Sequence, residues 1–333
     1  MASWRDTISV FCFRFQVSSS RFRPFVLSFQ TSALLGWLAL VLFVLAGEVP
    51  AMEAVSRPFV GVTHIVRSET KPRPLRMHLV DLDLAAPGLR FRLTPPAGPN
   101  ITRKETTLQF LIRQRAQLAI NAHFFEPWPP PDPDPGTATL VGLAAADGQV
   151  YAPFLEHPPK AFAIRPNAPA LNMDASNRVT IVHRRAGDAG GYAVAEPVGL
   201  YNALAGSEQI LSNGVVTAAD CEWNNRLDPR TAIGVTTNRH CMLFTVDGRQ
   251  PGRSEGLSVG EVARLLRDDY GVTDALSLDG GGSTTLAIAD PVPRVVNVPV
   301  GLRDTPGTER PVGSNLAIFA THRAERLPPT PQR

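Results

Sequence analysis

The sequence is poor in lysine. Of its 33 Lys and Arg residues, only Lys71, Lys104 and Lys160 are lysines, so arginine carries nearly all of the positive charge. Arginine is the better side chain for bidentate contacts to carboxylate and phosphate groups. The formal net charge is only +3 over 333 residues, and no dense run of Lys and Arg occurs. These absences argue against a nucleic-acid-binding protein, and we expect no nucleic-acid partner.

Cysteine is also scarce. Cys12 lies near the N-terminus, which leaves Cys221 and Cys241 in the remainder of the chain. In an oxidising compartment these two can form one disulfide, which would stabilise the fold by roughly 3 kcal/mol through loop closure. Two unpaired thiols are the alternative, because the sequence does not give the distance between them.

A long uncharged stretch stands near the N-terminus. Arg14, Arg21 and Arg23 precede the apolar run SALLGWLALVLFVLAG, and small residues follow it. This order is typical of a signal peptide. An uncleaved membrane anchor is the alternative, because residues 25–47 carry no charge and are just long enough to span a bilayer. We expect residues 1–54 to direct export and to provide any membrane contact, with a periplasmic or extracellular domain over residues 55–325 and a disordered tail over residues 326–333.

Regular alternation of strands and helices is missing, and so are internal repeats. Short apolar blocks between Pro and Gly residues predict many strands, including residues 160–166 (KAFAIRP). The segment EPWPPPDPDPG, residues 126–136, contains too many prolines for a helix or a central strand and predicts an exposed, stiff loop. The pattern favours one α+β domain with mixed sheets and few helices.

Only two segments have strong helical signals. Residues 106–117 place Leu108, Leu111 and Ile112 on one face. Residues 258–271 carry a capping box at the start and a glycine at the end. The second helix separates two strands, which predicts a crossover that leaves those strands parallel. Asp247 and Asp279, which end the two strands, are then expected at the same edge of the sheet.

Metal and nucleotide motifs are absent. The histidines and cysteines show no His-x-x-x-His or Cys-x-x-Cys spacing, and DGGGSTT lacks the alternating acidic ligands of a calcium loop. No Gly-Lys-Ser/Thr follows the glycines at 280–282, and a strand rather than a helix comes next, which excludes the Walker and dinucleotide patterns. We therefore expect no metal and no cofactor.

Asp279 is followed by three consecutive glycines, residues 280–282. Such a run indicates positive φ angles or a very close approach to the backbone. Consecutive exposed N–H groups can form a concave anion site, to which Ser283 and Thr284 would add hydroxyl donors. The alternative is a glycine-rich hairpin in which the aspartate only caps the turn.

Four segments together resemble the motifs of the phosphodiester glycosidase family. They are AINAHFF (119–125), PRTAIGVT (229–236), TVDGRQPGRSEGLSVGEVARLL (245–266) and ALSLDGGGSTTLAI (275–288). The likeness spans roughly residues 75–320, and the DGGGS and DGR…SEGL blocks are specific in combination. Two features depart from the family: His123 stands where members often carry a small residue, and the proline loop is peculiar to this chain.

The resemblance implies hydrolysis of the bond between a sugar anomeric carbon and a phosphodiester oxygen. The leaving phosphate is a stable anion, so the reaction needs charge stabilisation by arginine and oriented N–H groups more than a general acid. It also needs a carboxylate beside the oxocarbenium-like centre. The expected partner is a glycosyl phosphodiester or phosphoglycan, plausible in a cell wall or surface glycan.

This chemistry assigns roles to residues of the matching motifs. We expect Asp279 and Asp247 to be the carboxylate pair, with Arg230 on the phosphate, Glu255 as a reserve carboxylate and His123 as a general acid or base. Structural roles are the alternative for each: a turn for Asp247, an ion pair for Arg230, and burial for His123. The expected substrate-binding residues are Asn121, Gly280, Gly281, Gly282, Ser283, Thr284, Arg249, Ser254 and Arg310.

Two other functions fit the same residues. An envelope protein can hold a phosphoglycan on arginines and amide groups without cleaving it. An ordinary glycosidase can use the same carboxylates on a glycan without phosphate.

Overall fold

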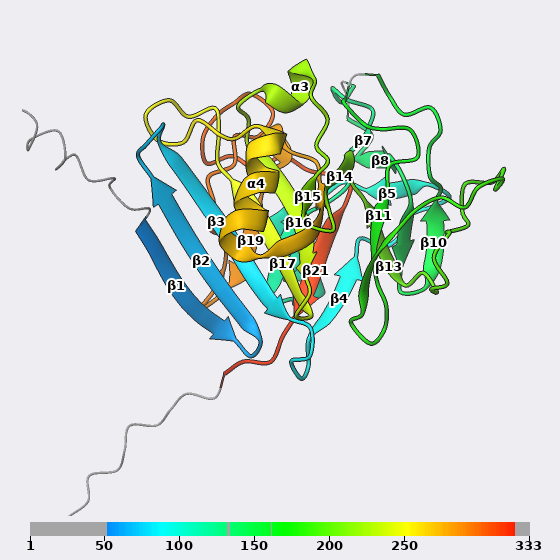
Figure 1. Ribbon diagram of the computed structural model, residues 1–333, viewed down its shortest axis with the longest axis horizontal. Coiled ribbons are helices and arrows are strands. Elements are labelled where there is room, and N and C mark those ends of the chain that lie inside the picture. The colour runs from blue at the N-terminus through cyan, green and yellow to red at the C-terminus, as the bar shows by residue number, and fades with distance from the viewer. Residues whose placement is uncertain (1–51, 132–133, 161, 324–333) are drawn as a thin grey trace, which may run out of the picture. The chain divides into compact units, whose positions relative to one another are not determined.

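The computed structural model describes residues 52–131, 134–160 and 162–323 (Figure 1). The predicted signal or anchor segment, residues 1–54, lies outside the described residues up to residue 51. The predicted tail, residues 326–333, also lies outside them. Residues 52–54 form the start of the first strand, ahead of residue 55, where we expected the domain to begin. Within the described residues, no helix combines the length and the apolar character that a membrane crossing requires.

The largest element is an eight-stranded antiparallel sheet. Its strand order is β1-β2-β3-β17-β16-β18-β14-β15. The strands are β1 (Met52–Phe59), β2 (Val62–Glu69), β3 (Leu75–Asp83), β17 (His240–Val246), β16 (Arg230–Thr236), β18 (Val272–Ser277), β14 (Glu208–Ser212) and β15 (Val215–Val216).

Three smaller sheets complete the strands of the described residues. One contains β20 (Pro293–Val295), β19 (Leu286–Ala289), β6 (Leu118–Asn121), β21 (Asn315–Phe319) and β4 (Arg90–Leu93), in this spatial order. The second contains β10 (Gln149–Ala152), β9 (Ala144–Ala146), β13 (Asn202–Ala205), β11 (Ala170–Met173) and β12 (Val179–Val182). The third contains β5 (Ile101–Arg103), β8 (Thr137–Leu140) and β7 (Phe125–Glu126).

Antiparallel pairing runs through all four sheets, so the prediction of mixed sheets was wrong. Strands make up most of the fold. The small number of helices agrees with the prediction, although the strands outweigh them more than the label α+β suggests. The predicted strand at 160–166 does not form; the described part of this segment is turn and loop.

The described helices are α2 (Thr107–Gln114), α3 (Glu222–Asn225), α4 (Val259–Tyr270) and the short 3-10 turn η1 (Gly281–Ser283). In α4 the predicted signals are confirmed: Ser258 and Glu261 form the capping box, and Gly271 ends the helix with φ 65°. The predicted inner face of α2 was partly wrong. Ile112 is 55% exposed, and Phe110 is buried in its place.

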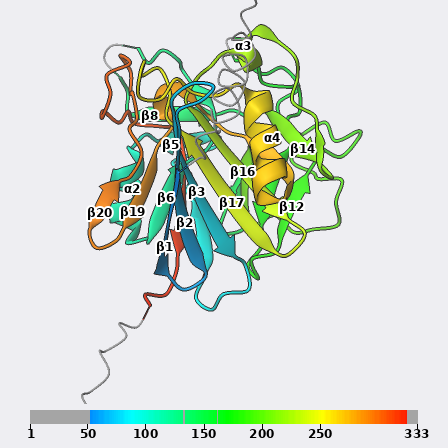
Figure 2. The ribbon, with the colours of Figure 1, turned by 60° about the vertical axis from the view of Figure 1, so that its left-hand side comes forward.

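Hydrophobic side chains alternate between the two faces of the large sheet, as strand geometry requires. In β17, Met242 and Phe244 pack against α4, whereas Cys241 and Leu243 face the opposite side. That opposite side meets the sheet of β6 and β21, whose outer face is covered by α2. Figure 2 shows α4 and α2 on the two outer sides of this pair of sheets.

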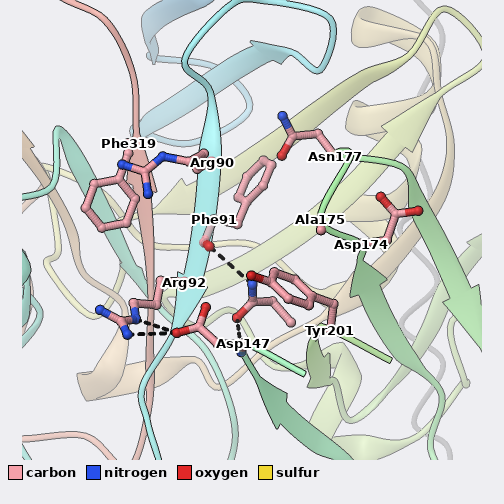
Figure 3. Close-up of a pocket in the computed structure, with 10 residues that line it drawn as sticks. Arg90, Phe91, Arg92, Asp147, Asp174, Ala175, Asn177, Tyr201 and Phe319 are labelled. Atoms are coloured by element: carbon pink, nitrogen blue, oxygen red, sulfur yellow. Dashed lines mark hydrogen bonds and ion pairs between the residues drawn. The ribbon is translucent and has the colours of Figure 1, made fainter. Parts of the chain in front are cut away.

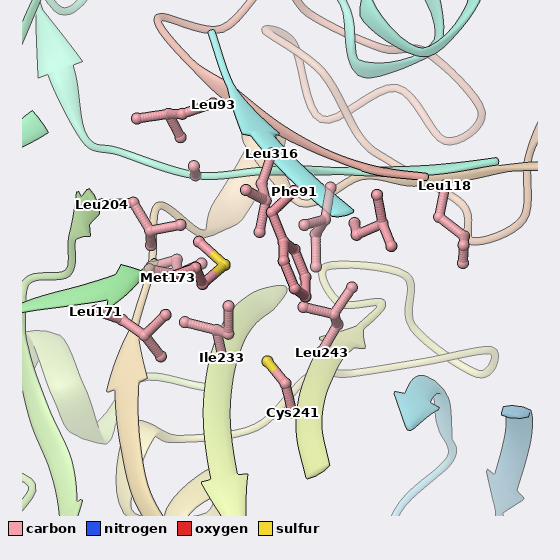
Figure 4. Close-up of a cluster of buried hydrophobic side chains, with 14 of the residues drawn as sticks. Phe91, Leu93, Leu118, Leu171, Met173, Leu204, Ile233, Cys241, Leu243 and Leu316 are labelled. Atoms are coloured by element: carbon pink, nitrogen blue, oxygen red, sulfur yellow. The ribbon is translucent and has the colours of Figure 1, made fainter. Parts of the chain in front are cut away.

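The main core lies between the sheets. Figure 4 shows Ile233 and Leu243 of the large sheet near Phe91 and Leu316 of the smaller one. Each fully buried side chain of this kind contributes roughly 1.5–3 kcal/mol of transfer free energy. This packing fixes how the ends of strands from the two sheets lie relative to one another.

The prediction of a crossover through α4 is confirmed. β17 and β18 both pair antiparallel with β16, which lies between them, so they run in the same direction. Their C-terminal ends lie at one edge, followed by Asp247 and Asp279, as expected from the sequence. Arg230 begins β16 at the same edge, because it pairs with Val246 at the end of β17.

Candidate active site

Strand ends from both sheets meet at this edge. Asn121, at the end of β6, pairs with Asn315 at the start of β21. Its side-chain oxygen accepts a hydrogen bond from Thr231 Oγ1 of β16 at 3.0 Å, which links the two sheets. A pocket of about 90 Å³ opens here, lined by Phe124, Trp128, Phe162, Trp223, Asp228, Arg230, Arg249, Asp279, Gly280, Gly281, Gly282 and Arg310.

Asp279 is fixed through its backbone. Its N–H donates to Ala122 O at 3.0 Å, and its carbonyl accepts from Asn121 Nδ2 at 2.6 Å. The carboxylate is only slightly exposed at the pocket wall. Burial raises the pKa of Asp279 to about 6, against the lowering effects of Arg310, Ser283 and the Gly280 N–H. The group therefore changes charge near pH 6.

Ser283 connects Asp279 to Arg310. The Ser283 hydroxyl donates to Asp279 Oδ2 and accepts from Arg310 Nε at 2.9 Å and from Arg310 Nη2. Arg310 Nη2 lies 3.7 Å from Asp279 Oδ2. On its other side, the guanidinium carbon lies 3.9 Å from the ring centroid of Trp128. Arg310 is thus enclosed by a hydroxyl, a carboxylate and an aromatic face.

The three glycines form a turn that passes close to three other groups. A Cβ at Gly280 would lie 2.8 Å from Pro229 O, and one at Gly282 only 1.8 Å from Gly301 O. Gly281 has φ 58°, and a Cβ there would lie 3.0 Å from Arg249 Nη2. Glycine is therefore needed mainly for close approach.

Three amide groups of this turn are already paired within the protein. The Gly281 N–H donates to Pro229 O at 2.8 Å. The Ser283 and Thr284 N–H groups donate to carbonyls within the turn, each at 3.2 Å. Donors that are already paired cannot hold a substrate anion, so the predicted nest of successive free amides was wrong.

Arginines supply the positive charge of the pocket instead. Arg230 Nε and Nη2 donate to the carbonyls of Leu257, Trp223 and Arg226 at 2.7–3.1 Å. Among the described residues its Nη1 has no hydrogen-bond partner, so one edge of a guanidinium held at Nε and Nη2 is available. Burial lowers the pKa of Arg230 to about 10, which leaves it charged at neutral pH.

Asp228 organises the second arginine. Its Oδ1 accepts from Arg249 Nε at 2.8 Å, and Arg249 Nη1 donates to Asp304 Oδ1 at 2.8 Å. These carboxylates raise the pKa of Arg249 against the effect of its burial. Asp228 was not predicted from the sequence. Its position two residues before Arg230, in DPR, was the available signal.

Aromatic side chains form the remaining wall. Phe162 contacts Phe124 with ring centroids 5.6 Å apart and Trp223 with centroids 6.4 Å apart. These residues come from separate loops and from α3, so no sequence motif joins them. The pocket thus combines two arginines held by backbone or carboxylate, a third stacked on Trp128, the carboxyl groups of Asp228 and Asp279, and apolar walls.

The sequence matches the phosphodiester glycosidase family over residues 114–319, more than half of the chain. The chain belongs to the phosphodiester glycosidase family. The resemblance inferred from the motifs is thereby confirmed, and every residue of the pocket lies within the matched range. Membership in the phosphodiester glycosidase family implies a glycosidase-type hydrolase.

Solved structures support the fold. The zebrafish N-acetylglucosamine-1-phosphodiester alpha-N-acetylglucosaminidase catalytic domain, auto-inhibited by its pro-peptide, matches with a TM-score of 0.56 and 16% identity, over 83% of this chain and 90% of that one. A hypothetical protein from Synechocystis matches with a TM-score of 0.55 and 16% identity, over 81% and 68%. Such low identities show the fold alone. A comparison with curated protein sequences found no significant match.

Asp247 does not take the place predicted for it in the phosphodiester glycosidase pocket. It lies at the expected edge, but it is buried and does not line the pocket. Its Oδ1 accepts from Asn297 Nδ2 at 3.1 Å and from Val298 N at 2.9 Å, because the segment after β20 covers it. Burial raises its pKa. The predicted pair of catalytic carboxylates is therefore reduced to Asp279.

Asn121 and His123 are structural. Asn121 donates to the Asp279 carbonyl and accepts from Thr231 Oγ1 and the Thr285 N–H. It is fully buried and does not line the pocket, so it cannot contact a sugar. His123 is fully buried and contacts Ser314 Oγ, Leu143 O and the Ala205 N–H. Burial lowers its pKa to about 4. A side chain sealed in this way cannot exchange protons with substrate, so the prediction of a general acid or base was wrong.

Four further predicted residues also lie outside the pocket lining. Ser254 donates to Asp247 O at 2.6 Å and accepts from the Arg76 N–H, which fixes the turn after β17. Thr284 is buried beside Thr231 Oγ1, at 3.3 Å. Glu255 is half-buried in the same turn, and Ser283 reaches the pocket only through its neighbours.

Cys221 and Cys241 are not bonded to each other. Cys241 pairs with Val235 toward the far end of β17, whereas Cys221 caps α3 near Arg230 at the pocket end. Five strand residues between Cys241 and Val246 correspond to about 17 Å. No disulfide can span that separation, so the alternative of two thiols holds.

A larger pocket of about 290 Å³ lies at the opposite end of the strands (Figure 3). Phe319, at the end of β21, and Arg90, at the start of β4, belong to it. Arg92 is neutralised there by Asp147 at 2.8 Å. None of the predicted site residues lines it. We therefore place the candidate active site in the smaller pocket.

Proposed function

We propose that the protein is an exported hydrolase that cleaves the sugar C1–O bond of glycosyl phosphodiesters. The observation that carries this proposal is the Asp279 carboxyl group, with its pKa raised to about 6, in one pocket with Arg230, Arg249 and Arg310. The zebrafish relative is named for an N-acetylglucosamine-1-phosphodiester, which has a linkage of this kind.

The arginines suit the phosphate half of such a substrate. Arg230 presents an unpaired Nη1, and Arg249 is held beside the glycine turn by Asp228 and Asp304. Planar guanidinium groups bind phosphate oxygens through paired, charge-assisted hydrogen bonds. A volume of about 90 Å³ is small for a whole ligand, so the phosphoryl group would fill it while the rest of the substrate lies at the rim.

Asp279 suits the sugar half. Its ionised carboxylate would stabilise the positive charge that develops at C1 as the C1–O bond breaks. The phosphate monoester leaves with the bonding electron pair, and the arginines hold its charge. The oxygen of a water molecule bonds to C1, and the proton that this water loses is taken up by the released phosphate monoester. Asp228, the other carboxylate of the pocket, is tied to Arg249. One free carboxylate is enough because a phosphate monoester needs little protonation to leave.

Export rests on the N-terminal sequence alone. The basic residues and the apolar run before residue 48 are typical of a signal peptide or an anchor. In a bacterium, the substrates would then be wall polymers or surface glycans with sugar 1-phosphodiester links.

The decisive experiment measures sugar release from an N-acetylglucosamine 1-phosphodiester and from its glucose counterpart. Wild-type protein should release free sugar and a phosphate monoester. Asp279→Asn should lower kcat by about 100- to 1,000-fold while circular dichroism shows an unchanged fold. Asp247→Asn is the matched control, since it removes a neighbouring buried carboxylate outside the pocket.

The other outcomes contradict the proposal in distinct ways. Phosphate binding by calorimetry without any sugar release would indicate an envelope binding protein. Equal rates on the diester and on the corresponding methyl glycoside would indicate an ordinary glycosidase. Full activity in Asp279→Asn would remove this carboxylate from the mechanism.

A further inference from the structure

Trp128 belongs to the proline-rich segment 126–136. The sequence predicts that loop to be exposed, yet Trp128 is half-buried and lines the pocket. Its ring lies against Arg310, with 3.9 Å between the guanidinium carbon and the ring centroid. This is the shortest of the cation–aromatic contacts among the described residues.

Arg310 has few ways to move. Its Nε and Nη2 both donate to Ser283 Oγ, and Trp128 covers one side of the guanidinium. An arginine with only one hydroxyl acceptor would otherwise be free to turn toward water. The stacked ring removes that alternative and also strengthens the field of the cation, because it excludes solvent.

The ring itself is mounted on the core. Trp128 contacts Phe125 edge to face, with centroids 6.2 Å apart and planes at 76°. Phe125 is buried in the main core and packs tightly against Gly313, where an added Cβ would lie 2.6 Å from Phe125 Cβ. Gly313 follows Arg310 closely along the chain. The contact with Phe125 therefore fixes the position of the Trp128 ring relative to residues 310–313, the segment that carries Arg310.

We propose that Trp128 is a positioning residue, which holds Arg310 against Ser283 and thereby orients the Asp279 carboxylate. This inference rests on the proposed function, in which Asp279 acts at the sugar carbon. In this role Trp128 acts through Arg310, whose guanidinium covers one face of its ring, and it needs no contact with substrate. Trp223, the other tryptophan of the pocket, stacks on Arg226 at 5.2 Å instead and is the matched control.

The first test compares Trp128→Phe, which keeps an aromatic face, with Trp128→Leu, which keeps only apolar volume. We expect Trp128→Leu to lower kcat by about 5- to 30-fold with KM changed less than about 3-fold. Trp128→Phe should retain at least about one third of kcat. Inorganic phosphate, titrated by calorimetry, should bind all three proteins equally, since Arg230 and Arg249 are untouched. Equal losses in both variants, or a loss confined to KM, would contradict a positioning role.

The second test is a double-mutant cycle with Arg310→Lys. If Trp128 acts through Arg310, Trp128→Leu should lower kcat little further once Arg310→Lys is present. Trp223→Leu combined with Arg310→Lys should instead give the product of the two single effects. Multiplicative effects for the Trp128 pair would overturn the inference.

The same cycle in urea denaturation needs no activity. The Trp128–Arg310 pair should show a coupling of about 3- to 30-fold in the unfolding equilibrium constant, and the Trp223–Arg310 pair none. Coupling without sugar release by wild type would refute the proposed function and leave the contact intact. Sugar release without coupling would refute the role of Trp128 alone.

Discussion

The Asp279 carboxylate and the Arg310 guanidinium lie 3.7 Å apart, with the Ser283 hydroxyl bonded to both. A direct ion pair at this depth would hold the pKa of the carboxyl group low. Here the hydroxyl takes two of the arginine donors, and burial outweighs the attraction, so the pKa rises to about 6. The Asp279 carboxyl group is therefore ionised at neutral pH, although burial disfavours its ionised form.

The pH dependence of turnover should follow this group. If the ionised form of Asp279 acts, kcat/KM will increase through about pH 6 and level off above it. Arg310 lowers the pKa of Asp279, so Arg310→Gln should move the midpoint to higher pH. Initial rates between pH 4.5 and 8.5 with a soluble glycosyl phosphodiester measure both. A rate that falls through pH 6 would instead make Asp279 a general acid.

The Asp279→Asn variant should also be more stable than wild type at high pH. A carboxyl group whose pKa is raised from 3.8 to about 6 by folding removes stability as the pH rises through that interval. Above pH 6 the loss is complete, so the variant should gain roughly 1–3 kcal/mol in unfolding free energy at pH 8. Near pH 4 the gain should be small. Urea denaturation at the two pH values measures this difference, and an equal effect at both would contradict a buried charge as its cause.

Local signals predicted local structure well. The capping box of Ser258 and Glu261 and the terminal Gly271 fixed α4, because helix ends are decided by a few neighbouring residues. Crossover geometry then placed Asp247 and Asp279 at one edge. Strand pairing was harder, since it depends on segments far apart in sequence, and the predicted mixed sheets proved antiparallel.

Side-chain burial was the main source of error at the site. Residues such as Arg230 and Arg249 lie in the pocket, but nothing in the sequence shows that residues 297 and 298 cover Asp247. The aromatic wall was missed for the same reason, because its members share no motif. His123 was predicted as a general acid or base, with burial as the alternative, and its partners come from three distant segments that enclose it.

Asp247 provides a test of this distinction. Asp247→Asn keeps an oxygen for the Val298 N–H and removes a buried charge, so we expect kcat within about 3-fold of wild type and unchanged or greater stability. Asp247→Ala leaves the Asn297 and Val298 donors unpaired and should lower the unfolding free energy by about 2–4 kcal/mol. Thermal denaturation and rate assays on both variants separate the two roles. A severe loss of kcat in a stable Asp247→Asn protein would restore Asp247 to the catalytic groups.

Gly281 and Gly282 of the glycine run should tolerate alanine unequally. At Gly282 an added Cβ would lie 1.8 Å from the Gly301 carbonyl oxygen, so the backbone itself must move, and we expect a loss above about 3 kcal/mol in unfolding free energy. At Gly281 the nearest atom is the flexible end of Arg249, and the main penalty is the positive φ, about 1–2 kcal/mol. Gly307→Ala is the control, because Gly307 has φ 84° with no atom within 4 Å and should lose a similar amount to Gly281→Ala. Urea denaturation of the three variants ranks them, and a loss at Gly282 no larger than at Gly281 and Gly307 would contradict close approach as the reason for the glycine at 282.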